Sequence, residues 1–591
     1  MSRPQESLNG YRSLLPYISQ FRGRYILGII CLIIVDAAQI AIPQFIRIAV
    51  DMISSGSFQL RRIIVICLYM VGTMAVVSLG RFLWRYFING SSRRIEAQLR
   101  ENIFDHLQKL SWDFYQKYKI GDLMARSIND LHAIRMALGM GLVAFFDFVF
   151  MASAILVIIF IQDARSAAYS VIPLPVITAL ILLFGSMAGK KFRTAHEAYS
   201  TLSDNAQETF AGISVIKSFV KEWWFIKKFS DSNDDYRKAN MELVRLFGFF
   251  FPFVSYLSGL TILVMLLIGG TRVINGLMTP GSLVAMFRYL SMLIWPLMGA
   301  GFMVNMIQRG KVALSRINEI LNTPASIQED DNPKTAQPKA AVPALEISGL
   351  EFSYNDNEKV LKDINLKIYR GQWLGIMGKT GSGKSTLIKT FMRMIDPPKG
   401  TVNIFGLDVR QWPLEDLRKL FAVSPQDSYL FSDSITNNIK YGFSGEDSGA
   451  LEKAVNLASL KKDMELFQEG RDTLIGERGL TLSGGQKQRT AIARAAIMDS
   501  EFLILDDSLC AVDNETELNI LEALREERKN RTTIIISHRV STLKYTDNVL
   551  VLDNGKTLEY GSPAQLIHAG GFYSRMAAFQ RLELQPGEKN G

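Results

Sequence analysis

Eight consecutive residues carry the strongest chemical signal in this chain of 591 residues. They match the pattern G-x-x-x-x-G-K-[ST] of a phosphate-binding loop, and they are Gly378, Lys379, Thr380, Gly381, Ser382, Gly383, Lys384 and Ser385. The glycines allow backbone N–H groups to converge on phosphate oxygens. We expect the Lys384 ammonium to reach the β- and γ-phosphates and the Ser385 hydroxyl to bind Mg²⁺. The pattern therefore predicts an ATP site; a glycine-rich turn that matches by chance is the alternative.

The residues on either side of this loop predict the elements that position it. Residues 373–377 (WLGIM) predict a buried strand before the loop, and residues 386–389 (TLIK) predict the start of a helix after it. This strand–loop–helix order is the context that the motif requires. It adds Thr386 to the residues expected to bind ATP.

Further polar residues stand at the ends of other predicted strands. Residues 502–507 (FLILDD) are four apolar residues followed by two carboxylates. They predict a buried parallel strand with its acids at the carboxyl end, where ligands of open α/β sheets bind. We expect Asp506 to hold Mg²⁺, directly or through water, and Asp507 to stand where a water-activating base is needed. His538 and Gln426 follow two more strands, and we expect His538 to contact the γ-phosphate or the attacking water and Gln426 to offer an oxygen to Mg²⁺ or that water.

A second glycine pair predicts another anion-binding element. Residues 482–486 (LSGGQ) precede a helix rich in Ala and Arg, and they include Ser483, Gly484, Gly485 and Gln486. Exposed N–H groups at a helix N-terminus bind anions, yet one γ-phosphate does not need two such sites in one chain. We therefore expect this element to contact ATP held by another copy or by a partner. A plain helix N-cap is the alternative.

The first half of the chain contains six apolar segments, each long enough to cross a hydrocarbon core of about 30 Å. They are residues 25–48, 63–87, 138–161, 167–188, 247–272 and 282–306. The connections after the second and fourth segments are charged, have a helical pattern and run about fifty residues, which predicts helices that continue out of the membrane on one side. Asp36 and Arg288 lie inside spans, where charged residues mark substrate pathways or pair with each other or with the backbone. We expect them in a substrate cavity, with structural pairing as the alternative.

The composition along the chain predicts the boundaries of its domains. Residues 1–24 predict an amphipathic lead-in, 25–322 a transmembrane domain, 323–344 a linker with four prolines, 345–580 a nucleotide-binding domain and 581–591 a tail. The net charge of +9 fits a protein beside anionic lipid that binds an anionic nucleotide. We expect no nucleic-acid partner, because no basic stripe is interleaved with aromatic residues. The three cysteines show neither a disulfide framework nor metal-ligand spacing.

The most specific of these motifs is LSGGQ, which lies between the phosphate loop and the strand that ends at Asp506. On these motifs and the six apolar segments, nearly the whole chain resembles a half-transporter of the ATP-binding cassette (ABC) exporters. The resemblance implies a multi-domain fold, with a six-helix all-α transmembrane domain followed by an α/β P-loop nucleotide-binding domain. It implies that Tyr354 stacks on adenine, that Gln426 belongs to the glutamine loop and that His538 is the switch histidine. It also implies that residues 476–479 sense the membrane domain, and that two nucleotide domains close head to tail on two ATP molecules.

One residue departs from the family pattern. The family places a glutamate, the catalytic base, after the position of Asp506, whereas this chain has Asp507. The shorter side chain withdraws the carboxylate, and a misplacement of about 1 Å costs on the order of 100-fold, or about 2.7 kcal/mol of barrier. The chain therefore resembles the degenerate-site subunit of heterodimeric multidrug-type exporters. A homodimer with Asp507 as a working base, and an ATP-gated channel or regulatory subunit, are the alternatives.

The remaining expectations follow from this resemblance. The expected partners are a second half-transporter, membrane lipid and an amphipathic substrate, which is a drug-like molecule, a lipid or a peptide. The expected place is a prokaryotic plasma membrane, with the nucleotide-binding domain in the cytoplasm, where ATP is available.

Overall fold

The computed structural model describes residues 10–56, 59–330, 332–339, 341–354, 358–443, 445, 448–467, 469–476 and 482–583. Contacts divide the chain into two units. The helical unit comprises Met1–Lys109 and Tyr118–Pro324, and the α/β unit comprises Leu110–Lys117 and Ala325–Gly591. Residues 1–9 of the predicted lead-in, 477–479 of the predicted sensing loop and 584–591 of the predicted tail lie outside the described residues.

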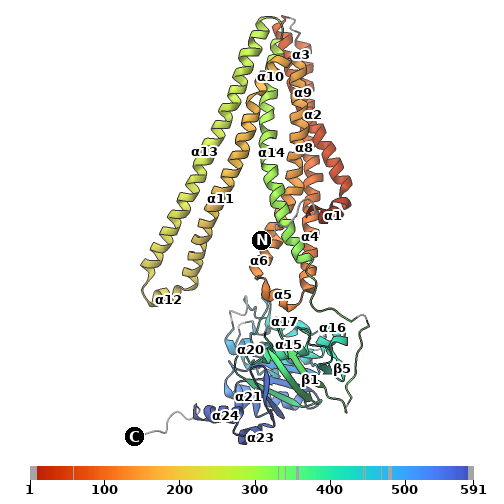
Figure 1. The fold of residues 1–591 in the computed structure, drawn as a ribbon, viewed down its shortest axis with the longest axis vertical. Coiled ribbons are helices and arrows are strands. Elements are labelled where there is room, and N and C mark those ends of the chain that lie inside the picture. Colours follow the sequence, from red (N-terminus) through yellow and green to blue (C-terminus); the bar gives the residue numbers. More distant parts are fainter. Residues whose placement is uncertain are drawn as a thin grey trace. The chain divides into compact units, whose positions relative to one another are not determined.

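The described part of the helical unit contains six continuous helices that are long and apolar enough to cross a membrane (Figure 1). They are Arg22–Ser54 (α2), Leu60–Lys109, Ile120–Gln162, Ala164–Ala211, Glu222–Ile274 (α13) and Pro280–Leu321 (α14). The second consists of α3 (Leu60–Trp84), a π-helical turn and α4 (Gly90–Lys109), and the fourth consists of α10 (Ala164–Val171) and α11 (Pro173–Ala211). The third runs from α6 (Ile120–Ala125) through α8 (Leu142–Asp147) to α9 (Ser153–Gln162). Each predicted span lies inside one of them, so the predicted six-helix domain is confirmed.

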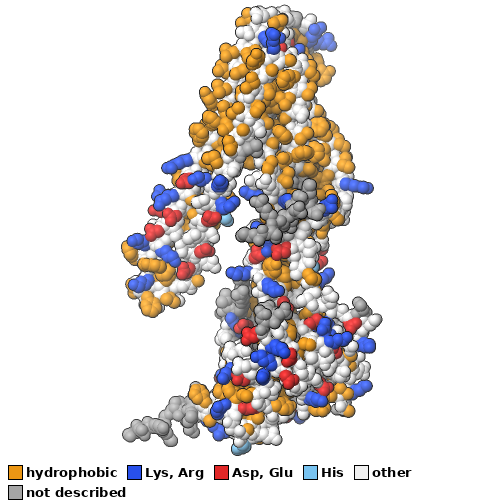
Figure 2. Space-filling view, in the orientation of Figure 1, with side chains coloured by type: hydrophobic (Ala, Val, Ile, Leu, Met, Phe, Trp, Pro, Cys, Tyr) orange, Lys and Arg blue, Asp and Glu red, His pale blue; other side chains and the backbone are white. Residues whose placement is uncertain are grey.

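These helices are much longer than a membrane requires. Helix α13 has 53 residues, which at 1.5 Å per residue is about 80 Å, whereas the hydrocarbon core is about 30 Å thick. Its continuation, and that of α11, forms the predicted helical extension, which a short helix α12 (Ile213–Ser218) connects at the tip. Figure 2 shows the apolar side chains gathered over the spans and charged ones over the extension.

Two polar contacts fix neighbouring helix ends in the helical unit. The Asp51 carboxylate at the end of α2 accepts hydrogen bonds from Gly281 N at 2.7 Å and Thr279 Oγ1 at 2.9 Å, at the start of α14. The approach is so close that a Cβ at Gly281 would lie 2.2 Å from the Arg47 carbonyl oxygen. Glycine is therefore required at this contact.

The α/β unit is built on two sheets. The smaller has the order β2-β1-β4-β5 and consists of antiparallel strands Leu361–Ile368 (β2), Leu345–Phe352 (β1), Val402–Ile404 (β4) and Leu407–Asp408 (β5). The larger has the order β10-β9-β3-β8-β7-β6 and consists of Lys556–Gly561 (β10), Asn548–Asp553 (β9), Trp373–Gly378 (β3), Thr532–Ile536 (β8), Phe502–Asp506 (β7) and Phe421–Ser424 (β6). All neighbours in it are parallel except β9 and β10. The carboxyl ends of β3, β6, β7 and β8 therefore meet at one edge.

Helices surround the larger sheet and complete the predicted α/β fold. Those that matter for the site are Lys384–Phe391 (α15), Gly484–Ala496 (α20), Asn514–Glu527 (α21), Val540–Leu543 (α22), Pro563–His568 (α23) and Phe572–Glu583 (α24). The central strands β3 and β8 are buried along their whole length, as expected for strands covered on both faces.

The predicted linker has neither helix nor strand among its described residues, yet it is attached to the α/β unit. Arg393, only 2% exposed, donates to the Gln328 carbonyl at 2.6 Å and to Asp396 at 2.6 Å. A short helix, Trp112–Lys117 (α5), also belongs to this unit, because Lys389 Nζ lies 5.2 Å from the Trp112 ring. The domain boundaries at 322 and 345 stay predictions, whereas contacts separate the units after Pro324.

Candidate nucleotide-binding site

The predicted phosphate loop connects the carboxyl end of β3 to the first turn of α15. Gly383 caps that helix with φ +101°, in the left-handed region, and a Cβ there would lie 2.8 Å from Leu361 Cδ2. Lys384 Nζ donates to the carbonyls of Gly378 at 2.8 Å and Lys379 at 2.9 Å. The loop thus surrounds the Lys384 ammonium. Gly383 has a backbone conformation that residues with a Cβ adopt only with strain.

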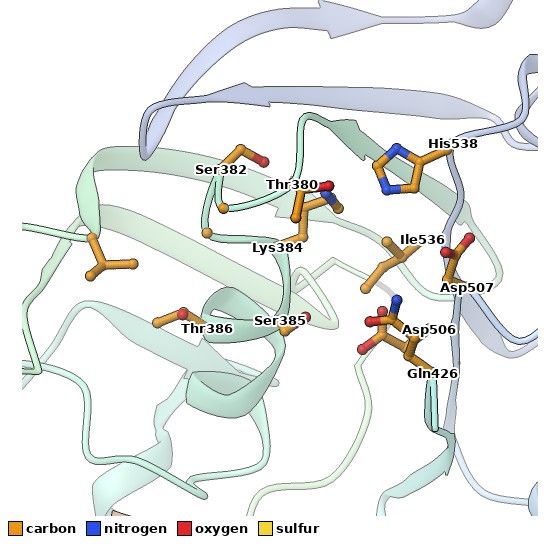
Figure 3. A pocket seen from close by; sticks show the side chains of 13 residues that line it. Thr380, Ser382, Lys384, Ser385, Thr386, Gln426, Asp506, Asp507, Ile536 and His538 are labelled. Atoms are coloured by element: carbon orange, nitrogen blue, oxygen red, sulfur yellow. The ribbon is translucent and has the colours of Figure 1, made fainter. Parts of the chain in front are cut away.

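A cavity of about 300 Å³ opens beside this loop (Figure 3). The structure brings together there most of the residues predicted to act on ATP: Thr380, Gly381, Ser382, Gly383, Lys384, Ser385, Thr386, Gln426, Asp506, Asp507 and His538. The Tyr354 hydroxyl lies 3.2 Å from Thr386 Oγ1, and this side chain is 39% exposed, so its ring is accessible beside the loop. The individual roles stay predictions.

Two lining residues were not predicted from the sequence. Val360 and Ile536 contribute apolar surface to the cavity. Ile536 is the last residue of β8, two residues before His538. Its place at the carboxyl end of this strand could have predicted that it lines the cavity. Val360 directly precedes β2, a strand of the other sheet, and its sequence neighbours carry no motif.

The charges of the site influence one another across the cavity. Burial lowers the pKa of Lys384, and the carboxylates of Asp506 and Asp507 oppose this shift. Burial, and then repulsion by Asp507, raises the pKa of Asp506 against the influence of Lys384 and Lys389. Burial also lowers the pKa of His538, to which Lys384 adds and which Asp507 opposes. The raised pKa of Asp506 means that the protein does not fully compensate the charge of this carboxylate, which favours a bound cation beside it.

Asp507 has an unusual backbone conformation. Its φ is +48°, in the left-handed region, and its N–H donates to the Ile536 carbonyl at 3.0 Å. Such conformations are uncommon for residues other than glycine, although Asp tolerates them better than most. Figure 3 shows Asp506, Asp507 and His538 facing the phosphate loop from the other side of the cavity. The position of the Asp507 carboxylate is thus set by a constrained backbone.

The side chains present fit both phosphate and Mg²⁺. Ser382 is 3% exposed, and its buried hydroxyl has no hydrogen-bond partner among the described residues. This hydroxyl is therefore available to donate to a phosphate oxygen. The Ser385 hydroxyl, the Gln426 amide oxygen and the Asp506 carboxylate line the same cavity. These are hard oxygen donors, which Mg²⁺ prefers.

The LSGGQ element does not line this cavity. Ser483 caps α20 by accepting from Gln486 N at 3.3 Å, and the Gln486 side chain accepts in turn from Ser483 N at 3.0 Å. The backbone of Gly485 passes so close to the loop after β7 that a Cβ would lie 3.0 Å from the Ala511 carbonyl oxygen. Gly484 is the first residue of the helix. The arrangement forms a helix cap, and none of its four residues lines the cavity beside the chain's own phosphate loop.

The helical unit contains a separate cavity of about 550 Å³. Its lining combines aromatic side chains with a few polar ones, and includes Phe184, Phe192, Phe247, Phe250, Phe302, His132, Asn305 and Arg309. Asp36 and Arg288, which we predicted in a substrate cavity, lie elsewhere: Asp36 is 4% exposed and has a carboxylate oxygen without a hydrogen-bond partner among the described residues, and Arg288 is exposed. Their role in substrate binding stays a prediction.

Comparison with known proteins identifies the family. A family model described as "ABC transporter transmembrane region" matches residues 25–297, and one described as "ABC transporter" matches residues 361–509. The probable multidrug resistance ABC transporter ATP-binding/permease protein YheI of Bacillus subtilis (strain 168) is 34% identical over 571 residues, covering 96% of this chain and 97% of that protein. This chain belongs to the ABC transporter family.

Other relatives of this ABC transporter agree with its architecture. The multidrug resistance-like ATP-binding protein MdlA of Escherichia coli (strain K12) is 33% identical, covering 95% of each chain. The solved structure of a bacterial Atm1-family ABC exporter with ATP bound matches with a TM-score of 0.77 and 25% identity, covering 97% of this chain and all of that one. The protein is therefore an ATP-hydrolysing exporter, and a multi-pass protein of the bacterial inner membrane.

Proposed function

We propose that this ABC transporter exports an amphipathic substrate as one half of a heterodimer, and that the ATP site containing Asp507 hydrolyses slowly. The observation that carries the proposal is Asp507 itself. It occupies the position where the family has its catalytic glutamate, with one methylene fewer and with a backbone constrained by φ +48° and by the bond to Ile536. The carboxylate cannot recover the missing length without moving the loop.

The proposed mechanism assigns each group of the cavity a task. The phosphate loop and Lys384 bind the phosphates of ATP, and Tyr354 stacks on the adenine. Ser385, Gln426 and Asp506 would hold Mg²⁺, which would supply positive charge to the phosphates. His538 holds the γ-phosphate through its imidazole, and Asp507 orients the attacking water less well than a glutamate would. ATP then remains bound at this site for longer than at a site with a glutamate.

The LSGGQ element supports a dimer. Ser483, Gly484, Gly485 and Gln486 form a helix N-terminus that does not line the chain's own cavity. We propose that they contact the γ-phosphate of ATP held by the partner, and so complete a competent site whose glutamate the partner supplies.

The tip of the helical extension also supports a partner. Around α12 the side chains of Phe219, Val220 and Trp223 are 69%, 81% and 72% exposed. This tip lies beyond the predicted spans, where lipid does not cover it, and contiguous exposed apolar surface marks interaction sites. We propose that the second half-transporter covers it.

The cavity of the helical unit supports an amphipathic substrate. Phe184 and Phe250 stack there with ring centroids 3.5 Å apart, and Arg309 and His132 are at the same cavity. An apolar wall with a few polar groups binds the body of a ligand by burial and fixes its polar end. Drug-like molecules, lipids and peptides all fit this description, as does membrane lipid that enters the cavity.

The native mass of the detergent-solubilised complex, isolated through this chain from its own host, tests the proposal. We expect a one-to-one complex with a different half-transporter that carries a glutamate at the position of Asp507. A complex of two copies of this chain would refute the heterodimer. The protein would then be a homodimeric lipid or multidrug exporter in which Asp507 is a working base.

A further inference from the structure

The loop that carries His538 is attached to the C-terminal helix α24 by one glutamine. Gln580 Nε2 donates to the His538 carbonyl at 2.7 Å, and Gln580 Oε1 accepts from Val540 N at 2.8 Å. One side-chain amide thus binds two backbone groups on either side of Arg539. Both bonds connect residues about forty positions apart in the sequence, so they exist only in the folded domain.

The opposite side of the same loop is also fixed. Arg539 donates through Nη1 to Glu517 at 2.7 Å and through Nη2 to the Cys510 carbonyl at 2.9 Å, and its N–H donates to Ser537 Oγ at 3.0 Å. Glu517 is 3% exposed, so this ion pair is partly buried against α21. The backbone of residues 537–540 is therefore held from two directions, while the imidazole of His538 faces the ATP cavity (Figure 3).

Helix α24 is itself anchored to the sheet that carries the phosphate loop. Tyr573 on α24 is fully buried in a cluster that contains Met377 of β3 and Leu543 of α22, and Met576 packs against this cluster. Gln580 lies four residues after Met576, and therefore on the same face of the helix. The strand before the phosphate loop and the helix that holds His538 thus share one core.

We propose that Gln580 is a positioning residue for ATP hydrolysis. By binding the His538 carbonyl and the Val540 N–H, it fixes the distance between the His538 imidazole and the γ-phosphate bound at the loop. Gln580 itself does not line the cavity and acts through His538. The inference rests on the proposed contact of His538 with the γ-phosphate.

The test measures hydrolysis at the site of this chain alone, in the complex isolated through this chain and placed in lipid. Bound 8-azido-ATP is cross-linked at successive times, and the loss of γ-label relative to α-label on this chain gives its single-turnover rate. Gln580→Leu removes both hydrogen bonds. The matched control is Gln565→Leu. The Gln565 side chain on α23 also binds a backbone group, because its Oε1 accepts from Ser562 N at 3.1 Å at the N-cap of that helix, and Gln565 does not line the cavity.

We expect Gln580→Leu to slow the single-turnover rate about tenfold with ATP affinity changed less than twofold, and Gln565→Leu to leave both unchanged. A shift well below 1 Å in a catalytic group accounts for a loss of this size. In a His538→Ala background, Gln580→Leu should cause no further loss, because residues that act as a unit are not additive. A purely structural role would not give this dependence on His538.

Three results would overturn the inference. A normal rate for Gln580→Leu, with His538→Ala slow, refutes the role of Gln580 and leaves that of His538 intact. A normal rate for His538→Ala refutes the proposed contact with the γ-phosphate, and the role of Gln580 with it. An equal loss in the presence and absence of His538 shows that Gln580 acts elsewhere. If Gln580→Leu does not fold, Gln580→Glu keeps the acceptor for Val540 N–H and loses the donor to His538, and it should also slow the reaction.

Discussion

Replacing Asp507 by glutamate should accelerate hydrolysis at this chain's own ATP site. The change adds one methylene, about 1.5 Å of carbon–carbon bond, to a carboxylate whose backbone is fixed by the N–H bond to Ile536 at 3.0 Å. A misplacement of about 1 Å costs on the order of 100-fold, or about 2.7 kcal/mol. Against this, glutamate tolerates φ +48° less well than aspartate, at a cost of about 1 kcal/mol.

The gain exceeds the cost. If all of the strain were felt in the transition state, about 1.7 kcal/mol would remain, which is about 18-fold in rate; if none were, the gain would be on the order of 100-fold. The assay is single-turnover hydrolysis of ATP bound to this chain, with Asp507→Asn as the matched variant that keeps the length and removes the charge. A glutamate variant no faster than the natural chain would refute this reasoning. So would loss of all steady-state turnover in Asp507→Asn, because Asp507 would then be an adequate base for the whole complex.

Three further predictions concern other parts of the α/β unit. Lys384→Ala should weaken ATP binding at this site at least tenfold, since it removes the ammonium that the loop surrounds; equilibrium binding of a fluorescent ATP analogue measures this, and unchanged affinity would exclude the loop as the ATP site. Because burial lowers the pKa of His538 from its ordinary value of 6.5, the imidazole is mostly neutral at pH 7 and gains a proton as the pH falls through this lowered pKa. Single-turnover hydrolysis should therefore be nearly flat between pH 8 and about 7 and show its His538-dependent midpoint below 6.5, and a midpoint above 6.5 would contradict this assignment. Arg393→Ala should destabilise the unit by about 1–3 kcal/mol in chemical denaturation, because it removes a buried donor from Asp396 and from the Gln328 carbonyl, although Asp396 keeps its ion pair with Arg410 at 3.8 Å; no measurable loss would show that the linker contact is unimportant.

Local patterns in the sequence predicted the parts of the fold that depend on local chemistry. The six spans follow from apolar length alone, and each was found inside a helix. The phosphate loop, Asp506 and His538 follow strands whose burial is visible in runs such as FLILD, and parallel pairing brings their carboxyl ends together. For these residues the position along a strand determines the position in space.

Contacts made across long stretches of chain could not be predicted in this way. Gln580 has no motif around it, and it meets His538 only because Tyr573 anchors α24 in the domain core. The lining of the cavity in the helical unit could not be predicted either, because its phenylalanines come from different helices and each has the sequence context of an ordinary span residue. Asp36 stood out as a charge in a span, but burial depends on the neighbouring helices and not on its own segment. The sequence alone can therefore identify a charged residue in a span, but the neighbouring residues of this side chain depend on how the helices pack.

The length of α13 has a mechanical consequence. Phe247 and Phe250 of the helical unit's cavity lie near the middle of this 53-residue helix, with roughly 40 Å of rod on either side. If the helix, which contains Pro252 close to its middle, were to tilt as one rod about that point, its two ends would move far and the pivot hardly at all. Travel of the α12 tip would therefore reappear, reversed in direction, near Ile274, while the phenylalanines at the pivot would rotate almost in place. Such a lever can open one end of the helical unit and change the orientation of aromatic rings around a bound molecule in a single motion.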